Sequence, residues 1–140
     1  MFHGIQLLNK RMKNSIFTWA LRIIAAVILF QTLFFKFTGA EESIYIFSTL
    51  GIEPYGRIIS GIAELIAVIL ILIPRTTLLG AIMSAGVMSG AILSHIFVLG
   101  IEVKNDGGTL FILAVITLIC SSILIFLYKH RIRDLLRFKL

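Results

Sequence analysis

The chain has 140 residues, of which 59% are hydrophobic and 14% are charged, with a formal net charge of +6. Its mean hydropathy of +1.03 excludes an ordinary soluble domain and places the chain among membrane proteins. A single cysteine, Cys120, excludes an intramolecular disulfide, a CxxC redox pair and a thiolate metal site. The positive charge is typical of contact with anionic lipid headgroups rather than nucleic acid, because no groove-reading motif accompanies it.

Four apolar runs each come close to the ~20 helical residues that cross a ~30 Å hydrocarbon core. They occupy residues 16–35, 57–74, 76–99 and 107–128. The sequence therefore predicts an all-α membrane protein, a four transmembrane helix bundle with a short interfacial helix between the first and second spans. The predicted organisation is a basic cytoplasmic tail (1–15), the membrane domain (16–128) and a second basic cytoplasmic tail (129–140).

Lysine and arginine residues outside the spans set the predicted orientation, because cytoplasmic segments are enriched in them. Both tails and the connection around Arg75 are basic, whereas the other two connections are rich in glutamate and aspartate. Both termini are therefore predicted to be cytoplasmic. Arg22 lies near the inner boundary of the first span, and its side chain is expected to extend to the cytoplasmic headgroups.

The first external connection carries its own helix signals. Thr38 and Glu41 have the spacing of a capping box, and Gly51 followed by Pro54 predicts a stop, so a short helix is expected near residues 39–50. Its apolar residues recur at helical spacing, which is typical of a helix lying along the outer membrane surface. Two interpretations remain open: the helix acts as a lid, or it is a spacer that returns the chain to the bilayer.

Small residues and a turn motif mark the second half of the chain. Gly86-x-x-x-Gly90 followed by Ser94 forms a stripe typical of close helix packing in lipid. We expect this stripe to pack against the chain's own helices, with self-association as the alternative. Residues 105–108, NDGG, predict a turn that places the Asp106 carboxylate near the amino end of the fourth helix, where it suits the helix dipole.

Glu64 lies in the middle of the second span, where an ionisable side chain must face the bundle interior or a wet cavity. It shares a helix face with Arg57, and His95 of the third span reaches a similar depth. Lys36 and Gln31 bring further polar groups to the outer half of the first helix, on different faces. The candidate ligand-binding or proton-handling residues are therefore Glu64, His95, Arg57, Lys36 and Gln31.

Two interpretations of this cluster remain open. In the functional one, Glu64 and His95 form a hydrogen-bonded pair in an outward-facing pocket and hold or pass a proton. In the structural one, they are a buried polar clasp between helices. Met83 and Met88 project differently from their helix, so the pattern favours core packing over copper ligation, and no metal site is expected.

Four segments resemble the DoxX family of small bacterial membrane proteins: FFKFTG (34–39), LGIEPYGR (50–57), GIAELIAVILILIP (61–74) and GAIMSAGVMSGAILSH (80–95). The resemblance covers roughly residues 20–128. It implies a four-helix protein of the bacterial plasma (inner) membrane, with Lys36 and Glu64 matching the family's lysine and glutamate. The family takes its name from a subunit of a thiosulfate:quinone oxidoreductase, so the resemblance implies an accessory role in thiol- or quinone-linked redox systems.

Three hypotheses for function follow, and the sequence leaves all three open. The first is an accessory subunit of a membrane redox system that binds an apolar ligand such as a quinone, without a covalent cofactor. The second is a small-molecule or proton-coupled transport component, for which four helices would require a homo-oligomer. The third is a membrane scaffold without chemistry that holds partner proteins or lipids. No catalytic residue is assigned.

Overall fold

The computed structural model describes residues 2–132, and the elements it contains are all helical. They are α1 (Phe2–Phe37), α2 (Glu41–Thr49), α3 (Tyr55–Leu72), α4 (Thr77–Ser94), the π-helix η1 (His95–Leu99), α5 (Thr109–Leu127) and the 3₁₀ helix η2 (Lys129–Arg131). The segments long and apolar enough to span a membrane are Ser15–Phe37, Tyr55–Leu72, Thr77–Leu99 and Thr109–Leu127. These confirm the predicted four-span helical fold. Arg133, Arg137 and Lys139 of the second predicted tail lie outside the described residues.

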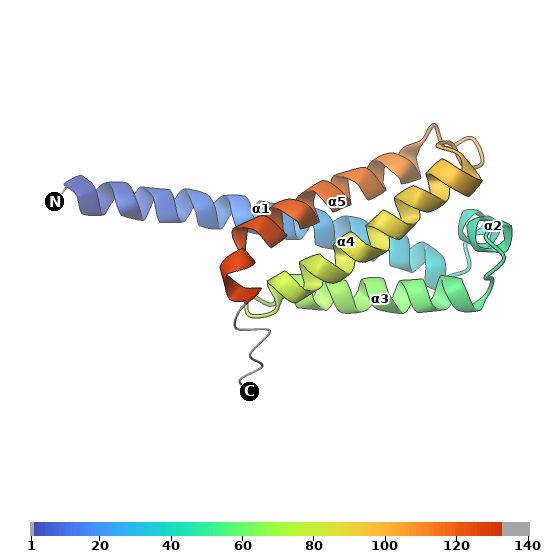
Figure 1. Cartoon of the computed structure of the whole chain (residues 1–140), viewed down its shortest axis with the longest axis horizontal. Helices are drawn as coiled ribbons and strands as arrows, with labels where there is room; N and C mark the ends of the chain where they lie inside the picture. The colour runs from blue at the N-terminus through green and yellow to red at the C-terminus, as the bar shows by residue number, and fades with distance from the viewer. Residues whose placement is uncertain (1, 133–140) are drawn as a thin grey trace.

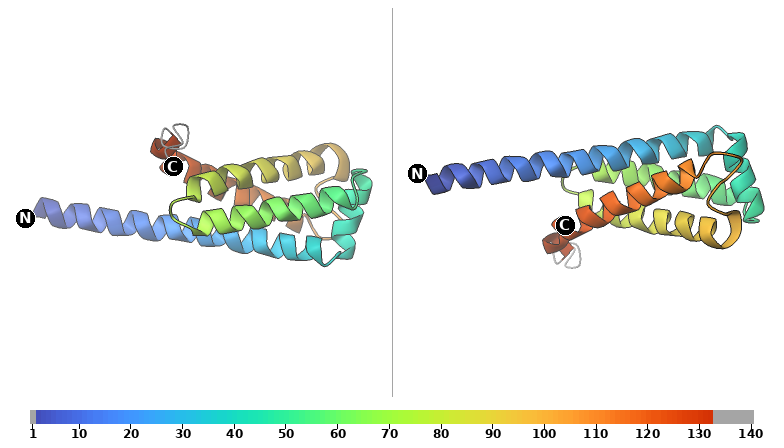
Figure 2. Two further views of the ribbon diagram at one scale, coloured as in Figure 1. Left: turned by 90° about the horizontal axis from the view of Figure 1, so that it is seen from below. Right: turned by 90° about the horizontal axis from the view of Figure 1, so that it is seen from above.

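The four spanning helices form a ring in which α1 and α4 each pack against both α3 and α5. Figures 1 and 2 show α2 at one end of this ring, which we call the α2 end, and the α3–α4 connection at the other, the turn end. The first part of α1 continues as a helix beyond the turn end, so the predicted tail 1–15 is helical from Phe2. Large apolar side chains such as Ile23, Val27 and Phe30 are exposed along α1, as expected for a surface that faces lipid.

The turn end is set by Pro74, which disfavours a helical backbone at the residue before it. Ile73 accordingly adopts an extended conformation, and α3 ends at Leu72. In lipid the last carbonyl groups of a helix need partners other than water. Thr76 and Thr77 supply two of them, because their hydroxyls donate to the carbonyls of Leu70 (2.9 Å) and Ile71 (3.1 Å).

Arg22 completes this cap, and its predicted extension to the headgroups is wrong. The side chain is only 2% exposed, and its Nε and Nη2 donate to the carbonyls of Ile71 (2.8 Å) and Leu72 (2.6 Å). The end of α3 presents several carbonyl oxygens and the negative pole of the helix dipole close to α1. A guanidinium with five N–H donors is therefore held inside the bundle, because a reach to the membrane surface would remove its hydrogen bond from the Leu72 carbonyl.

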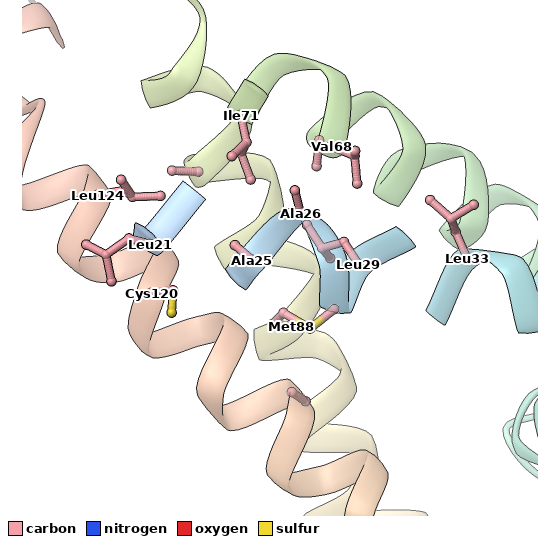
Figure 3. Packing of buried hydrophobic residues seen from close by; sticks show 13 residues of the cluster. Leu21, Ala25, Ala26, Leu29, Leu33, Val68, Ile71, Met88, Cys120 and Leu124 are labelled. Atoms are coloured by element: carbon pink, nitrogen blue, oxygen red, sulfur yellow. The ribbon is translucent and has the colours of Figure 1, made fainter. Parts of the chain in front are cut away.

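The hydrophobic core lies between the four spans and is built from small and branched side chains, as Figure 3 shows for Ala25, Ala26, Leu29, Ile71 and Leu124. Alanine on α1 lets neighbouring helices approach closely, which favours packing in lipid, where the hydrophobic effect contributes little between helices.

α3 and α4 approach each other closely at Gly80, where an added Cβ would lie 2.6 Å from the backbone nitrogen of Ile71. From this contact the two helices diverge, and Figure 1 shows them well apart at the α2 end. Further along α4, Ser84 joins α5 through a hydrogen bond of 2.8 Å between its hydroxyl and that of Ser121.

The short helix between the first two spans is present, but the predicted capping box is wrong. α2 begins after Ala40, which provides no side-chain cap. The Thr38 hydroxyl donates instead to the carbonyl of Phe34 at 2.8 Å, because α1 extends to Phe37 and Thr38 follows directly after it. The predicted stop is in place, since Gly51 adopts a positive φ of 78° immediately after the helix.

Candidate functional site

Glu64 is the fully buried carboxylate of α3, and its partners come from α1. Its Oε1 forms an ion pair with the Lys36 ammonium, and its Oε2 lies 3.1 Å from the Thr32 hydroxyl. Thr32 and Lys36 are four residues apart and share one face of α1. Because α1 and α3 are antiparallel and side chains lean toward the start of their own helix, Lys36 and Glu64 lean toward each other.

His95 lies at the first position of η1 and is buried. Its Nδ1 is 2.9 Å from the carbonyl oxygen of Gly100, and its own carbonyl accepts the Gly100 N–H at 2.7 Å. Since a carbonyl oxygen only accepts, Nδ1 carries the proton in this contact, and Nε2 of the neutral ring remains an acceptor. The ring meets Phe111 edge-on, with centroids 5.7 Å apart.

The hydrogen bond between Glu64 and His95, which the functional interpretation assumed, is absent: among the described residues Glu64 pairs with Lys36 and Thr32, and His95 with Gly100. The two side chains nevertheless line the same cavity, which has a volume of about 360 Å³. Such a volume is within the range of ~300–1,000 Å³ seen for small-molecule sites. Its polar contributors also include Thr32, Lys36 and Ser60.

Most of the cavity wall is apolar. Ile28 and Phe35 contribute from α1, and Val87, Met88 and Ala91 from α4. At the α2 end, α2 covers the cavity with Ile46 and Phe47, of which Phe47 is buried. α2 is tied to the connection after η1 by an ion pair of 3.1 Å between Glu41 and Lys104.

The stripe of Gly86, Gly90 and Ser94 also lines this cavity, and its predicted packing against the chain's own helices is wrong. A Cβ added at Gly86 or Gly90 would meet nothing within 4 Å, and both residues are exposed. Both glycines come after Gly80 in α4, the part of the helix that Figure 1 shows diverging from α3 toward the α2 end. The two glycines therefore lie at an open edge of the cavity, within the spanning part of the molecule.

Arg57 and Gln31 are not part of the cavity wall as the structure describes it. Arg57 donates through Nε to Glu53 at 2.9 Å and through Nη1 to the carbonyl of Lys36. Its side chain leans toward the start of α3, away from Glu64, for the same geometric reason that brings Lys36 to Glu64. Gln31 is exposed on the outside of α1.

Comparison with known proteins identifies the family. Residues 20–122 match the model of the DoxX-like family, which is most of the chain. The chain belongs to the DoxX-like family. No curated protein and no solved structure matches it. The matched part of this DoxX-like chain contains all of the polar cavity residues, from Thr32 and Lys36 on α1 to Glu64 and His95.

The cavity of this DoxX-like protein combines fixed polar groups with apolar walls. The Lys36–Glu64 pair, the Thr32 hydroxyl and the His95 ring can donate and accept hydrogen bonds within a mostly apolar site. Among residues 2–132, no three histidine, cysteine, aspartate or glutamate side chains gather in a way that could hold a metal ion.

Two cavity residues that contact the Lys36–Glu64 pair escaped the sequence prediction. Thr32 could have been found because it lies one helical turn before Lys36 on the same face. Phe47 could not have been found, because its position depends on how α2 packs across the end of the four-helix ring. Its ring centroid lies 5.8 Å from Lys36 Nζ, so it also contacts the charged pair.

Proposed function

We propose that this DoxX-like protein binds an apolar, lipid-soluble ligand in the cavity beside Glu64 and serves as an accessory subunit of a membrane redox system. The observation that carries the proposal is the combination of apolar walls with the Lys36–Glu64 pair and His95 in one cavity of about 360 Å³. Apolar pockets with a few fixed polar groups are typical of sites for small molecules that carry a polar head.

A quinone fits this donor set. When bound, it supplies reversible uptake of electrons and protons. The Lys36 ammonium has three N–H donors and can donate a hydrogen bond to a carbonyl oxygen. The Thr32 hydroxyl oxygen and Nε2 of neutral His95 can each accept one from a hydroxyl. Glu64 holds the Lys36 ammonium in place, and the apolar walls limit the access of water to it.

The open edge at Gly86 and Gly90 supports entry from the bilayer. A lipid-soluble molecule is concentrated in the hydrocarbon region, and both glycines are exposed within the third span. Without side chains they leave space for an apolar tail between α3 and α4 while the polar head lies near Lys36. The roof that α2 forms supports its role as a lid over the same site.

We also propose that the protein resides in the bacterial plasma membrane with both termini in the cytoplasm. The distribution of lysine and arginine supports this orientation, because the turn end carries Arg75, Lys129 and Arg131 and the α2 end carries most of the carboxylates. The cavity, which lies toward the α2 end, would then face outward.

A lipid extract of the purified protein tests the ligand proposal. The full chain is purified in a mild detergent, extracted with organic solvent, and the extract is read by mass spectrometry and ultraviolet absorption. We expect a quinone or a similar apolar compound in near-stoichiometric amount.

The matched variants are Ser60→Phe, which fills the cavity, and Ile59→Phe, which adds bulk at a neighbouring side chain that is 64% exposed. Ser60→Phe should reduce the co-purifying compound severalfold and Ile59→Phe should not. Phospholipid alone in the wild-type extract would contradict the proposal and favour a scaffold.

A further inference from the structure

A second cavity lies at the turn end, between the beginning of the α1 span and the end of α5. Its volume is about 570 Å³, and its wall includes Trp19 and Arg22 of α1 together with Tyr128, His130 and Arg131. None of these residues contributes to the cavity beside Glu64. The second cavity is therefore separate from the cavity beside Glu64.

The positive charge in this wall has no carboxylate partner among the described residues. The ion pairs of residues 2–132 join Lys36, Arg57 and Lys104 to glutamates, and none of them lies at the turn end. The described carboxylates belong to α2, to the two connections at the α2 end and to the middle of α3. Arg22 is 2% exposed and is held by carbonyl oxygens, which carry no net charge. A buried cation without a counter-ion is costly, so an anion that binds in this cavity would be stabilised by these guanidinium groups.

The two guanidinium groups are positioned by the same stretch of backbone. Arg22 donates to the carbonyl of Leu72, and Arg131 donates through Nη1 to the carbonyl of Pro74 at 3.1 Å. Each also lies over an aromatic ring, at 3.7 Å from the Trp19 centroid for Arg22 and 5.2 Å from the Tyr128 centroid for Arg131. Each guanidinium has five N–H donors, so both retain donors after these contacts. A planar guanidinium group held in this way can donate two parallel hydrogen bonds to two oxygens of a phosphate group.

We propose that the turn-end cavity binds the phosphate of an anionic phospholipid. The phosphate accepts hydrogen bonds from Arg22 and Arg131, and the acyl chains lie along the exposed apolar side chains of Phe17 and Leu127 in the same wall. This apolar part and the position at a membrane boundary favour a lipid over free phosphate. Because phosphodiesters occur in both leaflets, the proposal does not depend on the orientation of the chain.

Trp19 provides a direct readout, because it is the only tryptophan of the chain and lies in the cavity wall. The full-length protein in detergent is titrated with phosphatidylglycerol that carries brominated acyl chains, which quench indole fluorescence on contact. We expect saturable quenching, with apparent affinity at least about tenfold above that of brominated diacylglycerol, which lacks the phosphate, since one charge-assisted hydrogen bond is worth about that factor.

Matched variants separate a built site from general attraction to lipid. Arg22 also holds the end of α3, so replacing it would alter folding as well as lipid binding. Arg131→Gln is therefore the variant that tests the site. Lys129→Gln removes the same charge from a neighbouring position whose ammonium lies over Phe126 and is absent from the cavity wall. Arg131→Gln should weaken phosphatidylglycerol binding about tenfold, while Lys129→Gln should change it less than about twofold.

Three results would overturn the proposal: equal weakening in both variants, quenching by brominated diacylglycerol as tight as by phosphatidylglycerol, or inorganic phosphate binding as tightly as the lipid. The first two indicate lipid that merely surrounds the helices, and the third indicates a site for free phosphate. Displacement of the lipid by inorganic phosphate only at a large excess supports the proposed recognition.

Discussion

Lys36 and Glu64 form an ion pair across the contact of α1 with α3, although Lys36 lies near the end of its helix and Glu64 in the middle of its own. The Glu64 side chain is fully buried, whereas the Lys36 side chain is 15% exposed. Because of this difference in burial, removing Lys36 and removing Glu64 should change the free energy of unfolding by different amounts.

Lys36→Met should destabilise the protein more than Glu64→Leu. Without Lys36 the Glu64 carboxylate stays buried without a cation, and breaking a buried pair in this way costs about 3–5 kcal/mol. Without Glu64, the partly exposed Lys36 can extend its ammonium toward the membrane surface, so the loss is smaller. The free energy of unfolding in bicelles or mild detergent measures both.

The double variant Lys36→Met with Glu64→Leu serves as the control for this prediction. Because it leaves no charge unpaired, it should recover most of the stability that Lys36→Met loses. A double variant as unstable as the sum of the single ones would show that the pair contributes no coupling.

Gly80 and Gly86 should respond in opposite ways to the same substitution. Gly80→Ala places a Cβ 2.6 Å from the Ile71 nitrogen, so α3 and α4 must separate, at a cost of about 1–3 kcal/mol. Gly86→Ala meets nothing within 4 Å and gains up to about 1 kcal/mol of helix propensity. Thermal unfolding of the two variants compares them directly, and a destabilised Gly86→Ala protein would mean that the stripe packs against another helix.

Asp106 should make the connection before α5 sensitive to acid. Its carboxylate accepts hydrogen bonds from the backbone N–H groups of Val103 (3.0 Å), Gly108 (2.8 Å) and Leu110 (3.2 Å). Partial burial alone would raise the pKa of Asp106, but these three donors and the nearby His95 together lower it below its ordinary value of 3.8.

The pKa of Asp106 is lower in the folded than in the unfolded state, so the unfolded state binds its proton more readily. The stabilisation is therefore complete above pH 3.8 and is lost as the pH falls through the lower, folded value. Hydrogen exchange of the Val103, Gly108 and Leu110 amides should accelerate in that range. Asp106→Asn should show fast exchange at neutral pH already, and a variant that matches the wild type would contradict this role.

Reporter fusions test the proposed orientation. Fusions at residue 75 and after residue 140 should report a cytoplasmic location, and fusions near residues 45 and 104 an external one, because lysine and arginine gather at the turn end. An external carboxy terminus would reverse the assignment and turn the cavity beside Glu64 toward the cytoplasm.

The open edge of the cavity predicts a kinetic effect. Gly90→Leu places a bulky side chain at the open edge of the cavity, so exchange of the bound apolar compound with added lipid vesicles should slow severalfold. Leu93→Phe, at a position that is 53% exposed and outside the cavity wall, is the matched control. Equal exchange rates in both variants would indicate entry under α2 instead.

The number and length of the spans could be predicted because both follow from a local property, the length of an apolar run relative to the bilayer. The partner of Glu64 could not be predicted from a local property. Helical spacing indicates which residues share a face, and on that basis Arg57 and His95 were the expected neighbours. It does not give the lean of a long side chain, which carries the Lys36 ammonium toward Glu64 and the Arg57 guanidinium toward Glu53.

The glycine stripe and Arg22 were mispredicted for a related reason. The pattern of Gly86 and Gly90 indicates a surface that permits close approach, but whether a helix lies there depends on the tilt of α4 beyond Gly80. For Arg22, depth in the membrane suggested the headgroups as partners. The competing acceptors are the carbonyls of Ile71 and Leu72, which are distant in sequence and become neighbours only when α3 packs against α1.

The pairing of Lys36 with Glu64 has an electrical consequence. Moving one elementary charge across the full bilayer involves about 2.3 kcal/mol for every 100 mV of transmembrane potential. The two opposite charges in contact sum to zero, so the pair adds no net charge to the cavity wall on which the membrane field could act. A neutral molecule also carries no net charge, so it can occupy or leave the cavity without electrical work, and we expect its occupancy to be independent of whether the membrane is energised. A charged molecule would bring its own charge into the field, and its occupancy would follow the potential.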